Sequence, residues 1–348
     1  MFKNLLIFRI APGAELELLA AEAALQTQRF SPCAPSQAQT SGWVEPRGAQ
    51  HGPLIESVGG QWLLALKTEA KLLPSSVVKR RAQEIAEQLE HSTGRKPGRK
   101  QLKDLQEQAA LELLPQAFSR EGLIRLWLDP QARWLMLDCA SAKRAEEAIT
   151  LLLKALPGLA LAPVQTQLAP ATAMAHWLLG EELPAAFSID RDCELKAADE
   201  MKAAVRYARH ALDIEEVRGH IQAGKQPTRL ALTWRGRLSF VLTESWQIKR
   251  LAFDDVVFES TRGAGASPEE SFDADVAITT GELREWLVDV LEALGGELAA
   301  GAMPTELASA RVVAQPPAAA PSATPAAMPA AAPVPATLAD APEPPPWD

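Results

Sequence analysis

The chain has 348 residues, 47% of them hydrophobic, and a formal net charge of −9. This length suffices for a sizeable core and allows two or three domains. No segment reaches the ~18 apolar residues of a membrane span, and Arg9 interrupts the short apolar run at the N-terminus, so neither a membrane protein nor a signal peptide is expected. The three cysteines, Cys33, Cys139 and Cys193, form no CxxC pair, which predicts reduced thiols in the cytoplasm and no metal site.

The first half of the sequence alternates strand and helix patterns around a helical hairpin. Strands are expected at 2–10, 61–67, 123–129 and 133–139, and helices at 14–27, 75–90, 99–114 and 142–156. Residues 92–98 contain two glycines and a proline, which must break the helix there. Two helices joined by this basic turn predict an αα-hairpin that projects from a core.

The second half contains a further set of strand and helix patterns. Strands are expected at 201–208, 228–234, 237–243, 247–253 and 273–279, with one helix that starts at Asp213 and ends before Gly224, and another at 281–294. Thr279 and Glu282 have the spacing of a capping box for that last helix.

These patterns predict an α+β fold in four parts. A central α+β domain comprises 1–72 and 123–162, a helical-hairpin tip domain (73–122) is inserted into it, and a second α+β domain, the base, follows at 163–300. Residues 301–348 are rich in alanine and hold 12 of the 27 prolines, which predicts an extended, disordered tail.

The charges are unevenly distributed along the chain. Residues 79–103 hold eight basic and three acidic side chains, and residues 202–250 hold ten and four, whereas residues 254–306 hold two and thirteen. A fold with this distribution can present a basic face to a polyanion although its net charge is negative. The alternative is that these residues are ordinary solvated helix surface.

Catalytic signatures are weak. The sequence contains no Walker loop, GxSxG or HExxH motif, and the five histidines lack metal-ligand spacing. Asp273 and Asp275 would share one face of the expected strand, where two carboxylates could hold Mg²⁺ for phosphodiester hydrolysis. A metal-dependent nuclease is therefore one alternative function, and a solvated acidic patch is the simpler interpretation of these two residues.

Several stretches, in order over about residues 1–297, resemble the RdgC family of recombination-associated proteins. They are MFKNL (1–5), GWVEP (42–46), KLLPS (71–75), LLPQAFSR (113–120), DCASAK (138–143), HIQAGK (220–225), LALTW (230–234), KRL (249–251), FDADV (272–276) and TGEL (280–283). No single string is decisive, but their collinearity is specific.

The resemblance implies a non-enzymatic protein with no cofactor. Members of this family form head-to-head homodimers shaped as a closed ring with a basic hole. They bind double-stranded DNA with little sequence preference and single strands less well, associate with the nucleoid, and restrain RecA-mediated recombination. The family fold has a central α+β domain, with one dimer contact at the helical tip and another at the base.

Eight side chains are candidate DNA contacts, because sequence-independent binding needs cations that face phosphates. Five lie in or beside the hairpin turn and three on or just after a strand: Arg95, Lys96, Arg99, Lys100, Lys103, Arg206, Arg209 and His210. The resemblance places Arg95, Arg209 and His210 at DNA-facing positions. Gln116 replaces an arginine usual in relatives, which puts one phosphate contact in doubt.

Phe118 is the candidate gate residue of the ring. The resemblance makes it a hydrophobic contact between two tips, and the alternative is that it packs in the core of the helical hairpin. A third class of function, a protein-interaction scaffold, rests on the acidic residues of 254–306 and on the tail.

Overall fold

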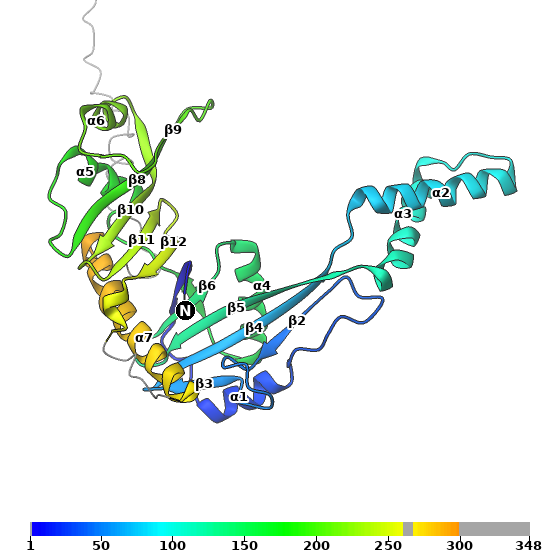
Figure 1. Ribbon diagram of the computed structural model, residues 1–348, viewed down its shortest axis with the longest axis horizontal. Coiled ribbons are helices and arrows are strands. Elements are labelled where there is room, and N and C mark those ends of the chain that lie inside the picture. The colour runs from blue at the N-terminus through cyan, green and yellow to red at the C-terminus, as the bar shows by residue number, and fades with distance from the viewer. Residues whose placement is uncertain (1, 260–266, 299–348) are drawn as a thin grey trace, which may run out of the picture. The chain divides into compact units, whose positions relative to one another are not determined.

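The computed structural model describes residues 2–259 and 267–298 (Figure 1). These residues form a mixed α+β fold with one large antiparallel sheet and seven α-helices. Among them, no helix combines the length and the apolar character that a membrane span needs. The tail predicted at 301–348 lies outside the described residues.

Twelve strands hydrogen-bond into the single sheet, in the order β2-β4-β5-β6-β1-β12-β11-β10-β8-β9, with β3 on β4 and β7 on β1. Their bounds are β1 Leu5–Ile10, β2 Gln39–Val44, β3 Ile55–Val58, β4 Gln61–Lys71, β5 Ser119–Asp129, β6 Trp134–Asp138, β7 Leu161–Pro163, β8 Phe187–Ala197, β9 Ala204–Tyr207, β10 Lys225–Trp234, β11 Leu238–Thr243 and β12 Ile248–Phe253. The pairing of Leu5 with Ile248 joins the strands of the two halves of the sequence.

Six helices lie between these strands in the sequence, and α7 follows the last of them. They are α1 Leu18–Gln26, α2 Ser75–Thr93, α3 Arg99–Leu113, α4 Ala142–Ala155, α5 Pro170–Leu179, α6 Glu215–Gln222 and α7 Pro268–Ala293, with 3₁₀ turns at Leu114–Gln116 and Asp255–Val257. The sequence patterns predict most of these elements, but they miss β2, β3, β7, β8 and α5.

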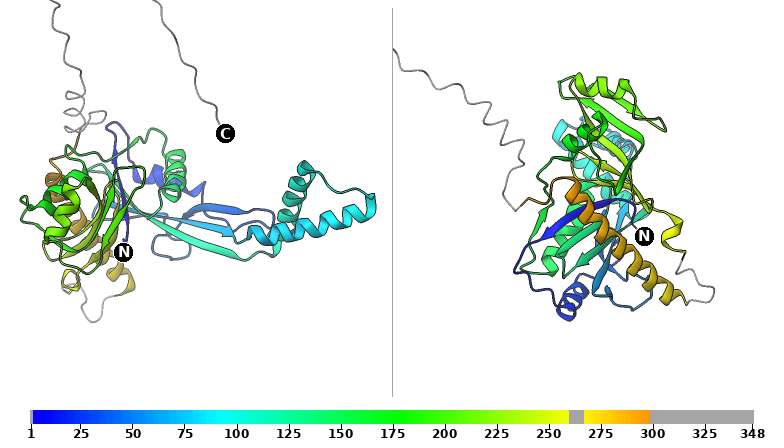
Figure 2. Two further views of the ribbon diagram at one scale, coloured as in Figure 1. Left: turned by 90° about the horizontal axis from the view of Figure 1, so that it is seen from above. Right: turned by 90° about the vertical axis from the view of Figure 1, so that its left-hand side faces the viewer.

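The strands β5 and β6 are buried on both faces of the sheet. Leu126 and Leu128 pack in a core with α1 and α4, whereas Trp127 between them belongs to a second core with α5 and α7. Successive side chains of a strand point to opposite faces, so one strand supplies both cores. Figure 2 shows α7, in gold, lying across the strands.

The helical hairpin of α2 and α3 is inserted between β4 and β5 and has a small core of its own. Small side chains let the two helices approach closely: the buried residues are Ala82, Ala86, Leu105 and Ala109. Arg81 of α2 bridges the helices by an ion pair with Glu112 at 3.0 Å. The Leu72 N–H donates to the Phe118 carbonyl at 2.7 Å, which closes the hairpin where its two ends meet the sheet.

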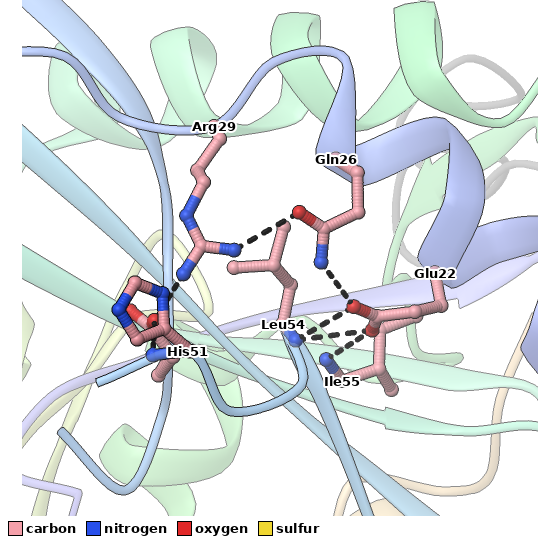
Figure 3. A network of polar contacts seen from close by, with 7 residues as sticks. Glu22, Gln26, Arg29, His51, Leu54 and Ile55 are labelled. Atoms are coloured by element: carbon pink, nitrogen blue, oxygen red, sulfur yellow. Dashed lines mark hydrogen bonds and ion pairs between the residues drawn. The ribbon is translucent and has the colours of Figure 1, made fainter. Parts of the chain in front are cut away.

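A polar network fixes the loop before β3 to α1 (Figure 3). The Glu22 carboxylate accepts the backbone N–H groups of Leu54 and Ile55 at 2.8–3.0 Å. Gln26 donates to Glu22 at 2.7 Å and accepts from Arg29 at 2.9 Å. The carboxylate satisfies donors that a buried loop would otherwise leave without partners, so this network is structural.

One long helix, α7, replaces the strand predicted at 273–279 and the separate helix predicted at 281–294. Its N-terminus is capped by Ser267, whose Oγ accepts the Glu270 N–H at 3.2 Å while the Glu270 carboxylate accepts the Ser267 N–H at 2.9 Å. The predicted capping box at Thr279 lies inside the helix, where Thr279 is buried.

The error has a physical cause in the burial pattern of α7. Val276, Thr280, Leu283 and Leu287 are fully buried at spacings of three and four residues, as on one face of a helix. Residues 273–279, taken alone, look like the alternation of a strand, because Asp273 and Asp275 alternate with apolar side chains. The helical period becomes evident only when the pattern is followed through to residue 293.

Candidate nucleic-acid interface

Five predicted cations lie together at the turn of the helical hairpin. This group, the hairpin patch, comprises Arg95 and Lys96 in the loop between α2 and α3, and Arg99, Lys100 and Lys103 in the first turns of α3. All five are exposed, and none of them forms an ion pair with another described residue. Gly94 ends α2 in the left-handed region with φ +70°, which a glycine adopts without strain and which turns the chain into the loop.

The backbone of α3 adds to the positive potential of the hairpin patch. No side chain caps its N-terminus and its first turn contains no acidic residue, so its first N–H groups point outward. The macrodipole makes cations unfavourable at this end of a helix and an anion favourable. Asp104 is the one carboxylate among the residues that line the hollow here, in the described part of the chain. The patch therefore suits a polyanion.

The other three predicted residues lie at or after β9. Arg206 is exposed on this edge strand, while Arg209 and His210 follow it in a tight turn. Arg209 adopts φ +56°, and its N–H donates to Asp192 Oδ1 at 2.8 Å. The His210 N–H donates to the Arg191 carbonyl at 3.0 Å, so the turn is tied to β8 at two points.

Asp192 of β8 organises this region, although the sequence patterns did not single it out. Its second oxygen, Oδ2, pairs with the Arg250 guanidinium of β12 at 2.8 Å. The Arg209 N–H, followed by the Arg250 hydrogen bond, lowers the pKa of Asp192 from its usual value. The carboxylate is therefore ionised and holds together two arginines that are 41 positions apart in the sequence.

Asp192 and Arg250 border a hollow lined by residues of β8, β9, β10, β11 and β12, which we call the base hollow. Its lining residues are Asp192, Cys193, Glu194, Arg206, Tyr207, Arg229, Val241, Lys249 and Arg250. Sequence reasoning missed Arg229, Lys249 and Arg250 as site residues. The available signal was the stretch of ten basic side chains over 202–250, but the residues that meet across the sheet cannot be read from that count.

Two further groups in the base hollow have their roles fixed by their neighbours. Burial raises the pKa of Cys193 to about 12, so this thiol stays protonated and is no nucleophile. Glu194 accepts hydrogen bonds from Lys196 at 3.0 Å and from Thr228 at 2.9 Å, and the Lys196 bond is the main reason that its pKa is lowered. The hollow therefore offers charge and shape, without a reactive group among these residues.

Phe118 lies on the surface, just before β5, with 85% of its area exposed. The alternative that it packs in the hairpin core is therefore wrong, and Leu114 of the preceding 3₁₀ turn is buried instead. Leu72 and Leu111 are also more than half exposed, so apolar area is available on the hairpin. Gln116, which replaces the arginine usual in relatives, is exposed in the 3₁₀ turn.

The acidic pair proposed for a nuclease does not assemble. Asp273 and Asp275 lie on α7, where residues two apart point in nearly opposite directions, and not on one face of a strand. Asp273 forms an ion pair with Arg47, which also pairs with Glu56 at 2.9 Å and lies over the Phe272 ring. Among the described residues, no three His, Cys, Asp or Glu side chains are placed to hold a metal ion together.

Comparison with known proteins identifies the family. The family model described as "Putative exonuclease, RdgC" matches residues 1–297. The chain is 47% identical over 300 residues to the recombination-associated protein RdgC of Dechloromonas aromatica, covering 85% of this chain and 98% of the relative. It is 45% identical over 296 residues to that of Cupriavidus necator and 44% over 301 residues to that of Bordetella pertussis, with the same two coverages. The chain therefore belongs to the RdgC family of recombination-associated proteins.

Proposed function

We propose that this chain binds double-stranded DNA without reading its base sequence. The observation that carries the proposal is the hairpin patch, whose five exposed cations have no ion-pair partner among the described residues and surround the positive end of α3. Phosphates are identical along every duplex, so cations that face them supply affinity without sequence preference. Arg206, Arg209 and His210 form a second contact region, and single strands are bound less well.

The acting unit in this proposal is a homodimer closed as a ring around the duplex. One contact lies between the tips, where the exposed ring of Phe118 offers apolar area at one residue, and the other lies between the base domains. A ring of this kind needs no sequence-specific contact to stay on DNA. It would associate with the nucleoid in the cytoplasm and restrain RecA-dependent recombination by occupying the duplex, in keeping with the recombination-associated name of its relatives.

We further propose that the chain binds DNA without cleaving it. The word exonuclease in the family description makes cleavage the second candidate. The engagement of Asp273 with Arg47, and its separation from Asp275 around the helix, support binding alone. Asp273 and Asp275 are therefore not placed to coordinate one metal ion together.

The test uses the full-length protein, an end-labelled linear duplex and a closed circular plasmid, each with Mg²⁺ and with Mn²⁺. Binding alone predicts that both DNAs migrate more slowly in a gel and are recovered intact after the protein is removed. If the wild type shortens the linear duplex and Asp273→Asn abolishes this shortening, the protein is a nuclease instead. Unshifted DNA at low salt would contradict both candidates and favour the protein-interaction scaffold.

A further inference from the structure

We propose that the base hollow is a phosphate subsite of the DNA-binding surface, in which Asp192 both positions the arginines and limits how tightly the subsite holds a phosphate. The inference rests on the proposed DNA binding and deepens it. It adds Lys249 and Arg250 to the contacts and assigns a role to an acidic residue in a basic surface.

The charges that line the base hollow leave an excess of cations. Four cationic side chains, Arg206, Arg229, Lys249 and Arg250, face two carboxylates. Glu194 is already engaged by Lys196 and Thr228 and lies 3.8 Å from Arg229. Arg206 and Lys249 have no ion-pair partner among the described residues, so they remain free to contact a phosphodiester.

The positioning role of Asp192 follows from its hydrogen bonds to two arginines. Arg209 and Arg250 have φ values of +56° and +52°, in the left-handed region that residues with a side chain seldom adopt. Asp192 accepts the Arg209 N–H with one oxygen and the Arg250 guanidinium with the other, both at 2.8 Å. One carboxylate thus holds the turn after β9 and the side chain from β12 beside the same hollow.

The limiting role of Asp192 follows from its charge. Its Oδ2 pairs with the Arg250 guanidinium and offsets part of its positive charge. Without this carboxylate, the full charge of Arg250 would attract a phosphate. An incoming phosphate must also approach a carboxylate of like charge. Removal of the charge and removal of the hydrogen-bond acceptor are therefore expected to change DNA affinity in opposite directions.

The experiment separates the two roles by comparing Asp192→Asn with Asp192→Ala. The Kd for a short duplex is measured by fluorescence anisotropy in about 100 mM salt, where surface charges still interact over ~10 Å. The amide keeps an oxygen for the Arg209 N–H but loses the charge, so affinity rises about two- to fivefold, the range for one exposed ion pair. The alanine variant loses the acceptor as well, so affinity falls below that of the wild type.

Glu285→Gln is the matched control, because it also turns a carboxylate paired with an exposed arginine, Arg235, into an amide. It changes the net charge equally but lies outside the lining of the hollow, so the duplex Kd is unchanged. Lys249→Gln tests the subsite independently of Asp192 and lowers the slope of log affinity against log salt by about one. Lys154→Gln, an exposed lysine of α4, is its control and leaves the slope unchanged.

Each other outcome overturns a defined part of the proposal. Equal gains in Asp192→Asn and Asp192→Ala would show that Asp192 acts by charge alone and positions nothing. An Asp192→Asn affinity no higher than that of Glu285→Gln, or a Lys249→Gln slope equal to that of Lys154→Gln, would show that the hollow does not contact DNA. In all these cases the wild type still binds, whereas a wild type that fails to bind duplex contradicts the proposed function itself.

Discussion

Arginines of this chain differ in role according to their partners. Arg81 and Arg47 each contact two carboxylates, so their charges are neutralised locally and they stabilise helix packing. Arg95 and Arg99 are exposed with no such partner in the described part of the chain. Only a cation of the second kind has its full charge available for a phosphate, so ion-pair partners separate the candidate DNA contacts from the other arginines better than residue type does.

Substitution of single cations is expected to weaken DNA binding without creating sequence preference. Arg95→Gln and Arg209→Gln should each lower the slope of log affinity against log salt by about one, because each removes one phosphate contact. Arg81→Gln is the control, since it removes the same charge from a side chain that Glu84 and Glu112 already engage. Slopes that fall equally in all three variants would show that net charge, and not these contacts, drives binding.

At the scale of elements, α7 anchors the second half of the sheet. Trp286 of this helix is fully buried and packs edge-to-face on Phe240 of β11, with ring centroids 5.2 Å apart. Asp289, one turn further on, accepts the Trp234 indole N–H of β10 at 2.7 Å. The helix is thus joined to two strands by both apolar and polar contacts.

Truncation of the buried indole should therefore cost much of the stability. Trp286→Ala is expected to lower the free energy of unfolding by about 3–5 kcal/mol, the range for large core aromatics. Val288→Ala, two residues away and 54% exposed, should change it by less than about 0.5 kcal/mol. Urea denaturation followed by circular dichroism measures both, and a small effect of Trp286→Ala would mean that α7 is not packed as described.

Local signals account for the elements that the sequence predicts well. The hairpin of β5 and β6 and the break between α2 and α3 are encoded by turn residues and by short periodic runs. By contrast, β8 carries charge on both faces, at Asp190, Arg191 and Asp192, because one face borders the base hollow. Its alternation is hidden, and a strand of this kind is evident only from its partners β10 and β9.

Close packing and apolar composition hide two more elements from sequence reasoning. Gly42 interrupts the β2 pattern because a Cβ there would lie 2.4 Å from the Phe30 Cα, so this strand needs a residue without a side chain. The helix α5 buries only one face, but its other face is also mostly apolar, so the sequence gives no amphipathic period.

The candidate site also has one part that local sequence predicts and one part that it does not. The hairpin patch could be predicted because its five cations are neighbours in the sequence, within residues 95–103. The base hollow could be predicted only in part, because Asp192 and Arg250 come from separate strands and Arg209 from the turn after a third. They are brought together by sheet pairing and by two left-handed residues that no propensity indicates.

At the scale of the whole molecule, the family model matches residues 1–297, so the last part of the chain lies outside it. The matched region covers 98% of the Dechloromonas aromatica protein but only 85% of this chain. Deletion of residues 302–348 is therefore expected to leave the melting temperature and the proposed dimer unchanged. Differential scanning calorimetry measures the melting temperature, and analytical ultracentrifugation measures the oligomeric state. A marked fall in the melting temperature, or dissociation to monomers, would show that the tail contributes to folding or assembly.

The proposed closed ring makes a prediction about DNA topology. Phe118→Ala should leave binding to short duplexes largely intact, because the phosphate contacts remain, but should shorten retention on closed circular plasmid after a salt challenge. Leu111→Ala, a second exposed apolar residue of the hairpin, serves as the control for lost apolar area. Linearising the plasmid should remove the advantage of the wild type, since rings slide off free ends. Equal dissociation of wild type and Phe118→Ala from circular and linear DNA would mean that Phe118 forms no gate.

The most direct test of the central claim is the salt dependence of Kd for two duplexes of unrelated sequence. Phosphate-driven binding predicts that affinity falls by roughly 10³-fold or more between ~50 and ~200 mM salt. It also predicts the same steep slope, and nearly the same Kd, for both sequences. A shallow slope, or a strong preference for one of the two duplexes, would contradict sequence-independent binding through the hairpin patch and the base hollow.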